Sequence, residues 1–256
     1  VIYDNFSTGL MENIEEINSG DIELINGDIL DLNKLIKAMK GVDIVSHHAA
    51  QLEIFVGIDE PEKDLSINTV GTLNVLNAAK QNNVKKVINA SSACIYGQTD
   101  KETTENDLTD PNWAYGVSKL AAEKYANIFS KYKNLPVTNL RYGIVYGERE
   151  WFRRVLPIFI KRIINGKSPI VFGKGNQIRD FIYVGDLVDL HNKCIFNEKA
   201  NGETFNVGTG IPTKIVELAK TACMLVDEGL EVLHEDLKEG EFSSFVNGKK
   251  RNIDEL

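Results

Sequence analysis

The sequence predicts an α/β protein built on a doubly wound parallel sheet, with a smaller lobe toward its C-terminal end. Short apolar segments alternate with amphipathic segments up to Tyr142, and this rhythm is typical of parallel strands joined by helices. After Tyr142 the rhythm becomes irregular, which indicates the second lobe. The 256 residues, 43% of them hydrophobic, are enough to bury a sizeable core.

The first half contains the clearer elements. Its predicted strands are short apolar runs that end at polar or glycine residues, such as Asp4-Asn5 after the first run. Its predicted helices are longer and repeat apolar residues at helical spacing, as at Val70, Leu73 and Leu76. In chain order, the strands are residues 1–3, 22–25, 42–46, 84–90 and 137–142, and the helices are 31–39, 68–81 and 113–132. Ligands of such sheets bind beyond the carboxyl ends of the strands.

The second half is predicted to mix helices with shorter strands. A turn at Gly173-Lys174-Gly175 separates two strands, Asp186 opens one helix and Thr213 caps another. The helices are residues 151–164, 186–194 and 213–226, and the strands are 169–172, 178–184 and 204–207. The tail over 235–256 is polar and weakly patterned.

Charge and cysteine content exclude several classes of protein. The 29 basic and 37 acidic residues give a net charge of −8, so we expect neither a nucleic acid nor a membrane as partner. No apolar run approaches the roughly 20 residues that a membrane-spanning helix needs. Cys94, Cys194 and Cys223 are widely spaced, and neither they nor the four histidines form a metal-binding pattern. Single cysteines favour a reducing compartment, so we expect a cytoplasmic protein.

Tyr115 and Lys119 form the strongest chemical signal. At positions i and i+4 of a predicted helix, their side chains lie on one face. A free tyrosine has a pKa near 10, and a nearby cation lowers that pKa, which suits the phenol to general acid–base catalysis. Ser92 follows an apolar strand, where it would hydrogen-bond a substrate oxygen beside Tyr115. Taken alone, a tyrosine and a lysine at this spacing also fit an ordinary surface pair.

Further motifs occur in a fixed order along most of the chain. In that order they are Asp4-Asn5 with Ser7-Thr8-Gly9, Gly27-Asp28-Ile29, His48-Ala49-Ala50, N-T-V-G-T-L-N-V-L from Asn68, S-S-A-C-I-Y-G, Y-G-V-S-K, Arg141-Tyr142-Gly143 and R-D-F-I-Y-V-G-D from Arg179. Together they resemble the extended short-chain dehydrogenase/reductases, specifically the NAD-dependent nucleotide-sugar epimerases and dehydratases.

The resemblance implies a Rossmann-like fold whose first βα unit is absent. Family members begin with a strand and a Gly-rich turn that cradles the cofactor pyrophosphate, whereas Val1 corresponds to the second strand of that pattern. We therefore expect a chain truncated at both ends. The implied NAD-binding domain is residues 1–148 with 178–208 returning to it, and the implied substrate-binding lobe is 149–177 with 209–256, incomplete at its C-terminus.

The resemblance also assigns roles to single residues. Asp4 would accept hydrogen bonds from the adenosine ribose and repel a 2′-phosphate, which favours NAD over NADP. Lys119 would touch the nicotinamide ribose, and Tyr142 would lie near the nicotinamide. The implied cofactor-binding residues are Asp4, Asn5, Ser7, Asp28, Ile29, Ala49, Ala50, Asn68, Tyr115, Lys119 and Tyr142. The implied substrate-binding residues are Ser92, Tyr115, Phe172 and Arg179, of which Arg179 would contact a nucleotide diphosphate. Arg149 is a further candidate for phosphate.

The choice of reaction depends on the residues that follow Ser92. The resembling dehydratases carry an Asp-Glu pair there and the decarboxylases a Glu, whereas this sequence has Ala93 and Cys94. Epimerisation at C4 does not need these additional carboxylates, so the predicted catalytic residues are Ser92, Tyr115 and Lys119. The predicted activity resembles that of UDP-glucose 4-epimerases. Ile144 replaces an Asn that related enzymes use toward the substrate, which leaves the sugar open.

Two alternatives stay open. S-S-A-C-I-Y also resembles GDP-mannose 3,5-epimerases, in which a cysteine at the Cys94 position acts as acid and base, although we interpret Cys94 as a small core residue. The other alternative is a non-catalytic NAD-binding scaffold. His47 and His48 are interpreted as structural, and Trp113 and Trp151 as packing between lobes. Helices 68–81 and 113–132 resemble those of the family's dimer interface, so a homodimer is predicted.

Overall fold

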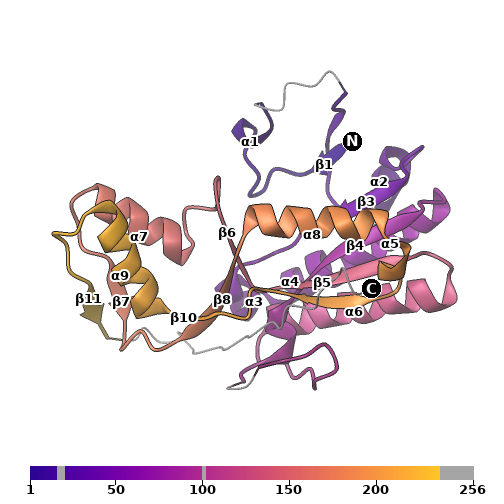
Figure 1. Ribbon diagram of the computed structural model, residues 1–256. Coiled ribbons are helices and arrows are strands. Elements are labelled where there is room, and N and C mark those ends of the chain that lie inside the picture. Colours follow the sequence, from indigo (N-terminus) through magenta and orange to yellow (C-terminus); the bar gives the residue numbers. More distant parts are fainter. Residues whose placement is uncertain (16–20, 100–101, 237–256) are drawn as a thin grey trace.

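Two pieces of parallel sheet form the N-terminal part of the molecule (Figure 1). The computed structural model describes residues 1–15, 21–99 and 102–236. In one piece, β1 (Ile2–Asp4) pairs with β2 (Leu24–Asn26). The other has the order β3-β4-β5-β9, formed by Ile44–His47, Lys86–Ser92, Val137–Tyr142 and Thr204–Val207. All these pairs are parallel, which confirms the predicted α/β class.

In the described residues, β1 and β3 do not pair with each other. Within the described residues β1 pairs only with β2, and β3 only with β4. The doubly wound sheet therefore consists of two pieces. Both end their strands on polar residues, Asp4 and Asn26 in one and His47, Ser92 and Tyr142 in the other.

Helices cover both faces of the four-stranded sheet (Figure 1). Because side chains alternate along a strand, Val87 of β4 and its neighbour Ile88 point to opposite faces. Val87 packs in a core cluster with Ala126 of α6 (Ala114–Tyr132), and with residues of α2 (Leu32–Ala38) and α5 (Gly71–Gln81). Ile88 packs in a second cluster with Leu187 of α8 (Val184–Phe196). The fully buried β4 separates these two clusters.

The segment before α5 is more irregular than the predicted single helix over 68–81. It forms α3 (Ile54–Asp59), α4 (Pro61–Leu65) and a π-helical turn, η1 (Ser66–Val70), before α5 begins at Gly71. Pro61 opens α4 at a position where its missing N–H costs nothing. The wide turn directs Asn68 and Thr69 into the interior, where both are buried.

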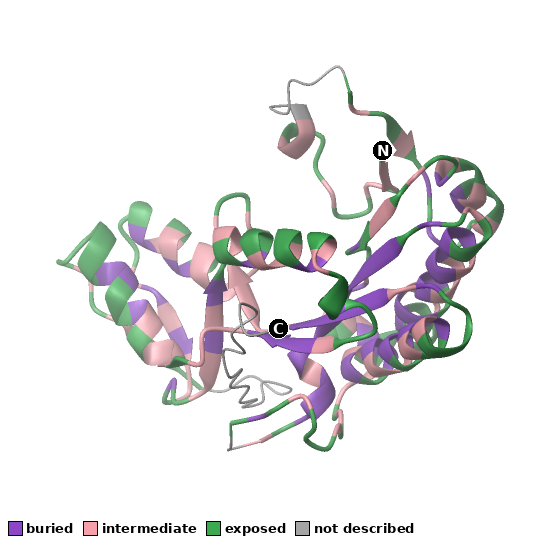
Figure 2. Cartoon of the chain, turned by 45° about the vertical axis from the view of Figure 1, so that its right-hand side comes forward, coloured by how far each residue is buried: buried purple, intermediate pink, exposed green. Residues whose placement is uncertain are grey.

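The second part of the molecule lies to the left in Figure 2. In the described residues it is formed by two small sheets and two helices. One sheet has the order β10-β8-β6, formed by Pro212–Lys214, Ile178–Tyr183 and Ile144–Tyr146. The other pairs β7 (Ile170–Phe172) with β11 (Leu233–Glu235). α7 (Val155–Ile164) and α9 (Ile215–Val226) pack a separate core cluster around Phe159 and Ala219.

Several predicted boundaries in this part were wrong. Thr213 lies in β10 rather than capping a helix, and α9 begins at Ile215, where the Lys214 N–H donates to Glu217 at 3.5 Å. The helix predicted from Trp151 begins at Val155. Unpredicted elements are α1 (Glu12–Glu15), η2 (Ala93–Tyr96), η3 (Glu198–Ala200), β6 and β11. Most of the polar tail, residues 237–256, lies outside the described residues.

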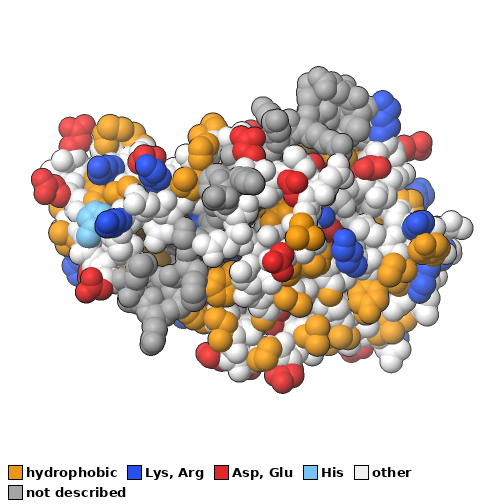
Figure 3. Space-filling view, turned by 90° about the horizontal axis from the view of Figure 1, so that it is seen from below, with side chains coloured by type: hydrophobic (Ala, Val, Ile, Leu, Met, Phe, Trp, Pro, Cys, Tyr) orange, Lys and Arg blue, Asp and Glu red, His pale blue; other side chains and the backbone are white. Residues whose placement is uncertain are grey.

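One face of the molecule carries exposed apolar side chains (Figure 3). On the outer side of α6 the exposed hydrophobic residues are Val117, Tyr125, Ile128 and Tyr132. Leu65 and Val70, just before α5, are exposed as well. In the parts of the chain that the structure describes, no helix is long and apolar enough to cross a membrane.

Candidate active site

Two of the three predicted catalytic residues, Ser92 and Tyr115, lie together at the carboxyl end of β4, and Lys119 follows on the next turn of α6. Ser92 is the last residue of this strand and accepts a hydrogen bond from the Cys94 N–H at 3.2 Å. Tyr115 lies in the first turn of α6 and hydrogen-bonds Ser92. Lys119 is one turn further and only 4% exposed. Tyr115 and Lys119 thus occupy positions i and i+4 of one helix, as the sequence indicates, and their catalytic roles stay predictions.

A glycine makes this proximity possible. A Cβ built on Gly116 would lie 2.7 Å from the Cys94 carbonyl oxygen, closer than real Cβ atoms approach. The first turn of α6 thus rests directly on the backbone of η2. Any side chain at position 116 would move Tyr115 away from Ser92.

Burial sets the protonation of this site. Burial raises the pKa of Tyr115 above its ordinary value and the Cys94 side chain raises it further, while the hydrogen bond with Ser92 opposes the rise. The expected lowering of the Tyr115 pKa by Lys119 is therefore wrong for the protein alone. Burial also lowers the pKa of Lys119 to about 8, opposed by Glu123 and Asp64.

A buried polar network lies behind Tyr115 and Lys119. Asn68 accepts a hydrogen bond from the Gln51 N–H at 2.8 Å and donates to the Gln51 carbonyl at 3.1 Å. It also donates to Ser118 at 3.0 Å, and Ser118 donates to Asp64. The Asn68 amide is thus engaged by the chain itself. Its predicted cofactor role would be exerted through the loop at Gln51.

Several predicted adenosine-binding residues gather where β1 and β2 end. Asp4 accepts from the Phe6 N–H at 2.7 Å, and its second carboxylate oxygen has no hydrogen-bond partner among the described residues. Asn5 donates to Asp28 at 3.0 Å and accepts from the exposed Ser7 at 3.0 Å. A Cβ on Gly9 would lie 3.3 Å from Asp4, so glycine leaves this carboxylate open to a ribose.

Ile29 lies apart from this group. Its side chain is buried in the core against α5, so close that a Cβ on Gly71 would lie 2.4 Å from Ile29 Cδ1. Only the backbone of Ile29 could therefore face an adenine. Ala49 and Ala50, which follow β3, are exposed and half-buried, and their small side chains leave the sheet edge open.

The two adjacent histidines differ in their surroundings. His47 is buried, bonds Thr72 at 2.9 Å and has a pKa lowered to about 3 by burial, so it is neutral. His48 lies 3.1 Å from the Tyr142 hydroxyl and stacks on its ring. Tyr142 is the register partner of Ser92 in the β4–β5 pair, so both residues lie at the same carboxyl edge of the sheet.

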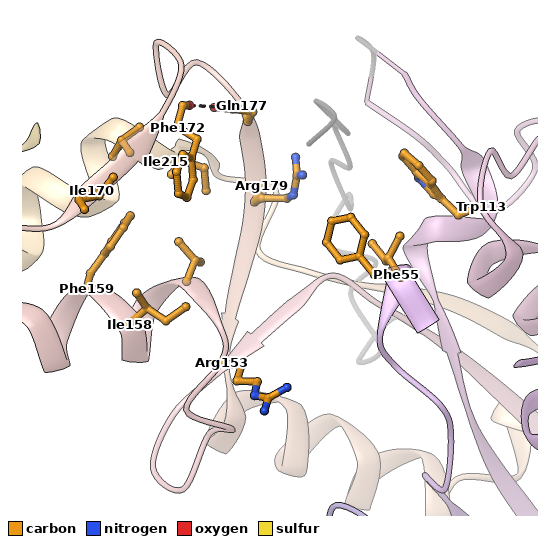
Figure 4. Close-up of a pocket in the computed structure, with 13 residues that line it drawn as sticks. Phe55, Trp113, Arg153, Ile158, Phe159, Ile170, Phe172, Gln177, Arg179 and Ile215 are labelled. Carbon is orange, nitrogen blue, oxygen red and sulfur yellow. Dashed lines mark hydrogen bonds between the residues drawn. The ribbon is translucent and has the colours of Figure 1, made fainter. Parts of the chain in front are cut away.

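A cavity of about 360 Å³ separates the two parts of the molecule (Figure 4). Phe172 and Arg179 line it, which supports their prediction as substrate residues. Phe55 and Trp113 lie on one side of Arg179, and Phe172 and Ile215 lie on the other. The interpretation of Trp113 as plain lobe packing is therefore wrong, since it lines the cavity.

Most of the cavity lining was not predicted from the sequence, including Phe55, Arg153 and Ile215. Phe55 lies in α3 and Ile215 begins α9, and an apolar helix residue looks the same in a sequence whether it lines a cavity or a core. Arg153 replaces the predicted Arg149, which instead donates to the Asn13 carbonyl at 3.3 Å. The cavity thus holds two guanidinium groups beside apolar walls.

Cys94 connects the cavity to the catalytic residues. It is only partly buried, so the interpretation of Cys94 as a core residue is wrong. Burial raises the pKa of Tyr115 and lowers the pKa of Arg179, and the Cys94 side chain adds to the first shift and opposes the second, which indicates that it lies near both. Within the described parts of the chain, no three His, Cys, Asp or Glu side chains are arranged to hold a metal ion.

Comparison with known proteins agrees with this geometry. The model of the NAD dependent epimerase/dehydratase family matches residues 5–208. The UDP-glucose 4-epimerase of Mycolicibacterium smegmatis is 32% identical, over 84% of this chain and 71% of its own length. The structure of a UDP-N-acetylglucosamine 4-epimerase from Methanobrevibacter ruminantium, in complex with UDP-N-acetylmuramic acid, has a TM-score of 0.90 at 30% identity, covering 97% of this chain and 80% of that one. A UDP-glucose 4-epimerase from Thermus thermophilus in complex with NAD has a TM-score of 0.86 at 28% identity, covering 97% and 81%.

Proposed function

Because this chain belongs to the NAD-dependent epimerase/dehydratase family, we propose that it interconverts UDP-glucose and UDP-galactose by epimerisation at C4. The observation that carries the proposal is the meeting of Ser92, Tyr115 and Lys119 beside a cavity without carboxylates. No Asp or Glu stands among the described residues that line the cavity. Elimination of water needs an acid for the leaving hydroxyl, whereas epimerisation needs only one base and a hydride carrier.

The cofactor is NAD, and the residues at the strand ends fit it. Asp4 offers a free carboxylate oxygen for the ribose, and the small Ala49 and Ala50 leave room beside the sheet. When bound, NAD supplies the nicotinamide that exchanges a hydride with the sugar. Lys119 and Tyr142 lie where the nicotinamide ribose and ring are expected.

The chain's own residues move the proton. In its phenolate form Tyr115 would take the proton of the C4 hydroxyl and later return it from the phenol, while Ser92 hydrogen-bonds the same oxygen. Because burial disfavours the phenolate, a nearby positive charge is needed when it forms. Lys119, with a pKa of about 8, carries that charge at neutral pH.

The cavity supports a nucleoside diphosphate sugar as substrate. Arg179 and Arg153 offer guanidinium groups to the diphosphate. Phe172 and Ile215 would then face the nucleobase, and Phe55 and Trp113 the sugar, since Trp113 is two residues from Tyr115. The choice of UDP-glucose rests on the relatives named above.

A product assay tests the proposal. The protein is supplied with NAD and either UDP-glucose or UDP-galactose, and the nucleotide sugars are separated by chromatography. Interconversion of the two supports the proposal. Bound NAD without conversion of any UDP-hexose or of GDP-mannose would identify a non-catalytic scaffold instead.

A second candidate is epimerisation of GDP-mannose with Cys94 as acid and base. It is favoured by the position of Cys94, which is partly exposed and close to both Tyr115 and Arg179. Conversion of GDP-mannose that Cys94→Ala abolishes would establish this reaction. Conversion of UDP-glucose that survives Cys94→Ala would rule it out.

The remaining proposals concern the protein as a whole. We propose a homodimer formed through the apolar face of α6, supported by exposed Val117 and Ile128. We also propose that residues 1–148 with 178–208 bind NAD, and that 149–177 with 209–256 form the substrate lobe. A cytoplasmic location is supported by the three free thiols.

A further inference from the structure

Asp64 is a buried carboxylate that the mechanism above does not use. It belongs to α4 and is fully buried. One carboxylate oxygen accepts a hydrogen bond from Ser118, and the other accepts from Gln51 Nε2 at 3.0 Å. It forms no ion pair with any basic side chain in the described parts of the chain. Burying a carboxylate charge without a paired cation costs free energy of folding, which indicates that Asp64 has a role at this position.

Ser118 links Asp64 to the catalytic turn of α6. Its hydroxyl donates to Asp64, accepts from Asn68 at 3.0 Å and lies 3.0 Å from the Tyr115 carbonyl oxygen. Ser118 stands between Tyr115 and Lys119 in the chain, so its position fixes both. The Thr69 hydroxyl donates to the Ser118 carbonyl at 2.9 Å and holds the same turn from η1.

The close packing of Gly57 restricts the position of the Asp64 carboxylate. A Cβ on Gly57 would lie 3.1 Å from the Asp64 carboxylate, tighter than most real contacts. Gly57 is itself buried in α3. The absence of a side chain at position 57 therefore makes the room that the carboxylate occupies.

The charge of Asp64 acts on both Lys119 and Tyr115. Burial lowers the pKa of Lys119, which Glu123 and Asp64 oppose, and burial raises the pKa of Tyr115, to which Asp64 adds a small part. The titratable groups that act on or are affected by the Lys119 ammonium are Asp64 of α4, Glu123 of α6 and the two histidines after β3. Both histidines are neutral, with pKa values lowered to about 3 for His47 and about 4 for His48. Glu123 is already paired with Arg141 at 2.6 Å. Asp64 is thus the unneutralised negative charge near Lys119 among the described residues.

We propose that Asp64 is a positioning residue for this site: through Ser118 it fixes the turn that carries Tyr115 and Lys119, and its charge keeps the Lys119 ammonium in the active form. The proposal rests on the epimerase activity proposed above for its kinetic part. Asp64 acts through its neighbours and touches no substrate.

The test separates the charge of Asp64 from its hydrogen bond. In the NAD-loaded protein, Asp64→Asn removes the charge and keeps the shape, whereas Ser118→Ala removes the hydrogen bond and keeps the charge. Glu62→Gln, an exposed carboxylate on the same helix, is the matched control. For each protein kcat, KM and the pH dependence of kcat are measured with UDP-galactose.

We expect Asp64→Asn to lower kcat about tenfold or more with KM within about twofold. The alkaline limb of its pH profile should move about one unit toward lower pH, because the Lys119 ammonium loses a favourable charge. Ser118→Ala should lower kcat without moving this limb, and Glu62→Gln should do neither. If Asp64→Asn behaves like Glu62→Gln, the proposal is wrong.

A measurement without turnover keeps the proposal distinct from the proposed function. The pKa of Lys119 is followed by NMR titration, with its signal assigned by Lys119→Arg. A lower pKa in Asp64→Asn than in Glu62→Gln supports the charge role even if no UDP-sugar is converted, and an equal pKa contradicts it. Should Asp64→Asn fail to fold, Ser118→Ala decides: a loss of kcat at constant KM supports the proposal, and full kcat contradicts it.

Discussion

At the residue scale, the proposed mechanism depends on the hydroxyl of Tyr115. Tyr115→Phe keeps the ring and its packing but removes the group that bonds Ser92. We expect kcat to fall by roughly 10²- to 10⁴-fold, the usual contribution of a positioned acid or base. NAD binding should remain, because the ring stays in place. Epimerase assays together with the NAD content of the purified variant check this, and a variant with full activity would disprove the mechanism.

The pH dependence follows from Lys119. Burial lowers its pKa from 10.5 to about 8, so the ammonium is charged below pH 8 and loses its proton above. Since the phenolate of Tyr115 needs that charge, kcat should decline as the pH rises through about 8. A kcat profile between pH 6 and about 10, with folding monitored by circular dichroism, measures the limb. A kcat that stays level throughout this range would show that the charge of Lys119 is dispensable.

The sequence predicted Phe172 and Arg179 in the substrate site but not most of the apolar residues that line the cavity. Ser92, Tyr115 and Lys119 were predictable, because hydroxyl, phenol and ammonium at this spacing point to one chemistry. Phe55 and Trp113 were not, because an aromatic side chain in a cavity and one in a core look alike in a sequence. The direction of the Tyr115 pKa shift was missed as well, since the cost of burial depends on packing.

At the scale of elements, the contact between α6 and η2 sets the active-site geometry. Gly116→Ala would place a methyl group 2.7 Å from the Cys94 carbonyl oxygen, so the helix must move. We expect kcat to fall by about 10²-fold, since a displacement near 1 Å is costly to catalysis. Lys124→Ala, an exposed change on the same helix, should keep full activity. Steady-state kinetics compare the two, and equal activity would show that Gly116 is not needed for the approach.

The buried pair of Glu123 and Arg141 joins α6 to β5. Glu123 accepts from Arg141 at 2.6 and 3.0 Å and also from Ser91 at 2.7 Å. Glu123→Ala would leave a buried guanidinium unpaired, which costs about 3–5 kcal/mol of the free energy of unfolding. For comparison, Lys63→Ala removes an exposed pair with Glu60 and should cost under about 1 kcal/mol. Urea denaturation measures both, and similar losses would contradict the assigned role.

Elements with strong patterns were predictable, and those shaped by their surroundings were not. The β5 strand was predicted with its observed bounds, and α6 to within one residue, because their apolar patterns are long and regular. The π-helical turn at Ser66–Val70 was missed, since it arises where Asn68 turns inward to bond Gln51. β6 and β11 have three residues each and form only because partners lie beside them.

At the scale of the whole molecule, the apolar face of α6 predicts the oligomeric state. Val117 and Ile128 on this face are 51% and 43% exposed. Apolar side chains that are grouped and exposed in this way are typical of a surface that binds another protein. If this face joins two copies, Ile128→Glu should convert a dimer to a monomer. The substitution would bury one unpaired glutamate charge from each copy in the interface, and the loss of hydration of these charges is costly. Light scattering measures the mass, with Lys124→Glu as the exposed control. A mass unchanged by Ile128→Glu would place the contact elsewhere.

The cavity has a mechanical consequence. Its walls come from Phe55 and Trp113 on one side and from Phe172 and Ile215 on the other, segments that are far apart along the chain. A molecule bound between these walls would contact both of them. Its free energy of binding would then stabilise the folded arrangement in which the two walls face each other. At a hundredfold excess over Kd that gain is about 2.7 kcal/mol. Loss of a molecule bound in the cavity would therefore remove this stabilisation from the contact between its two walls.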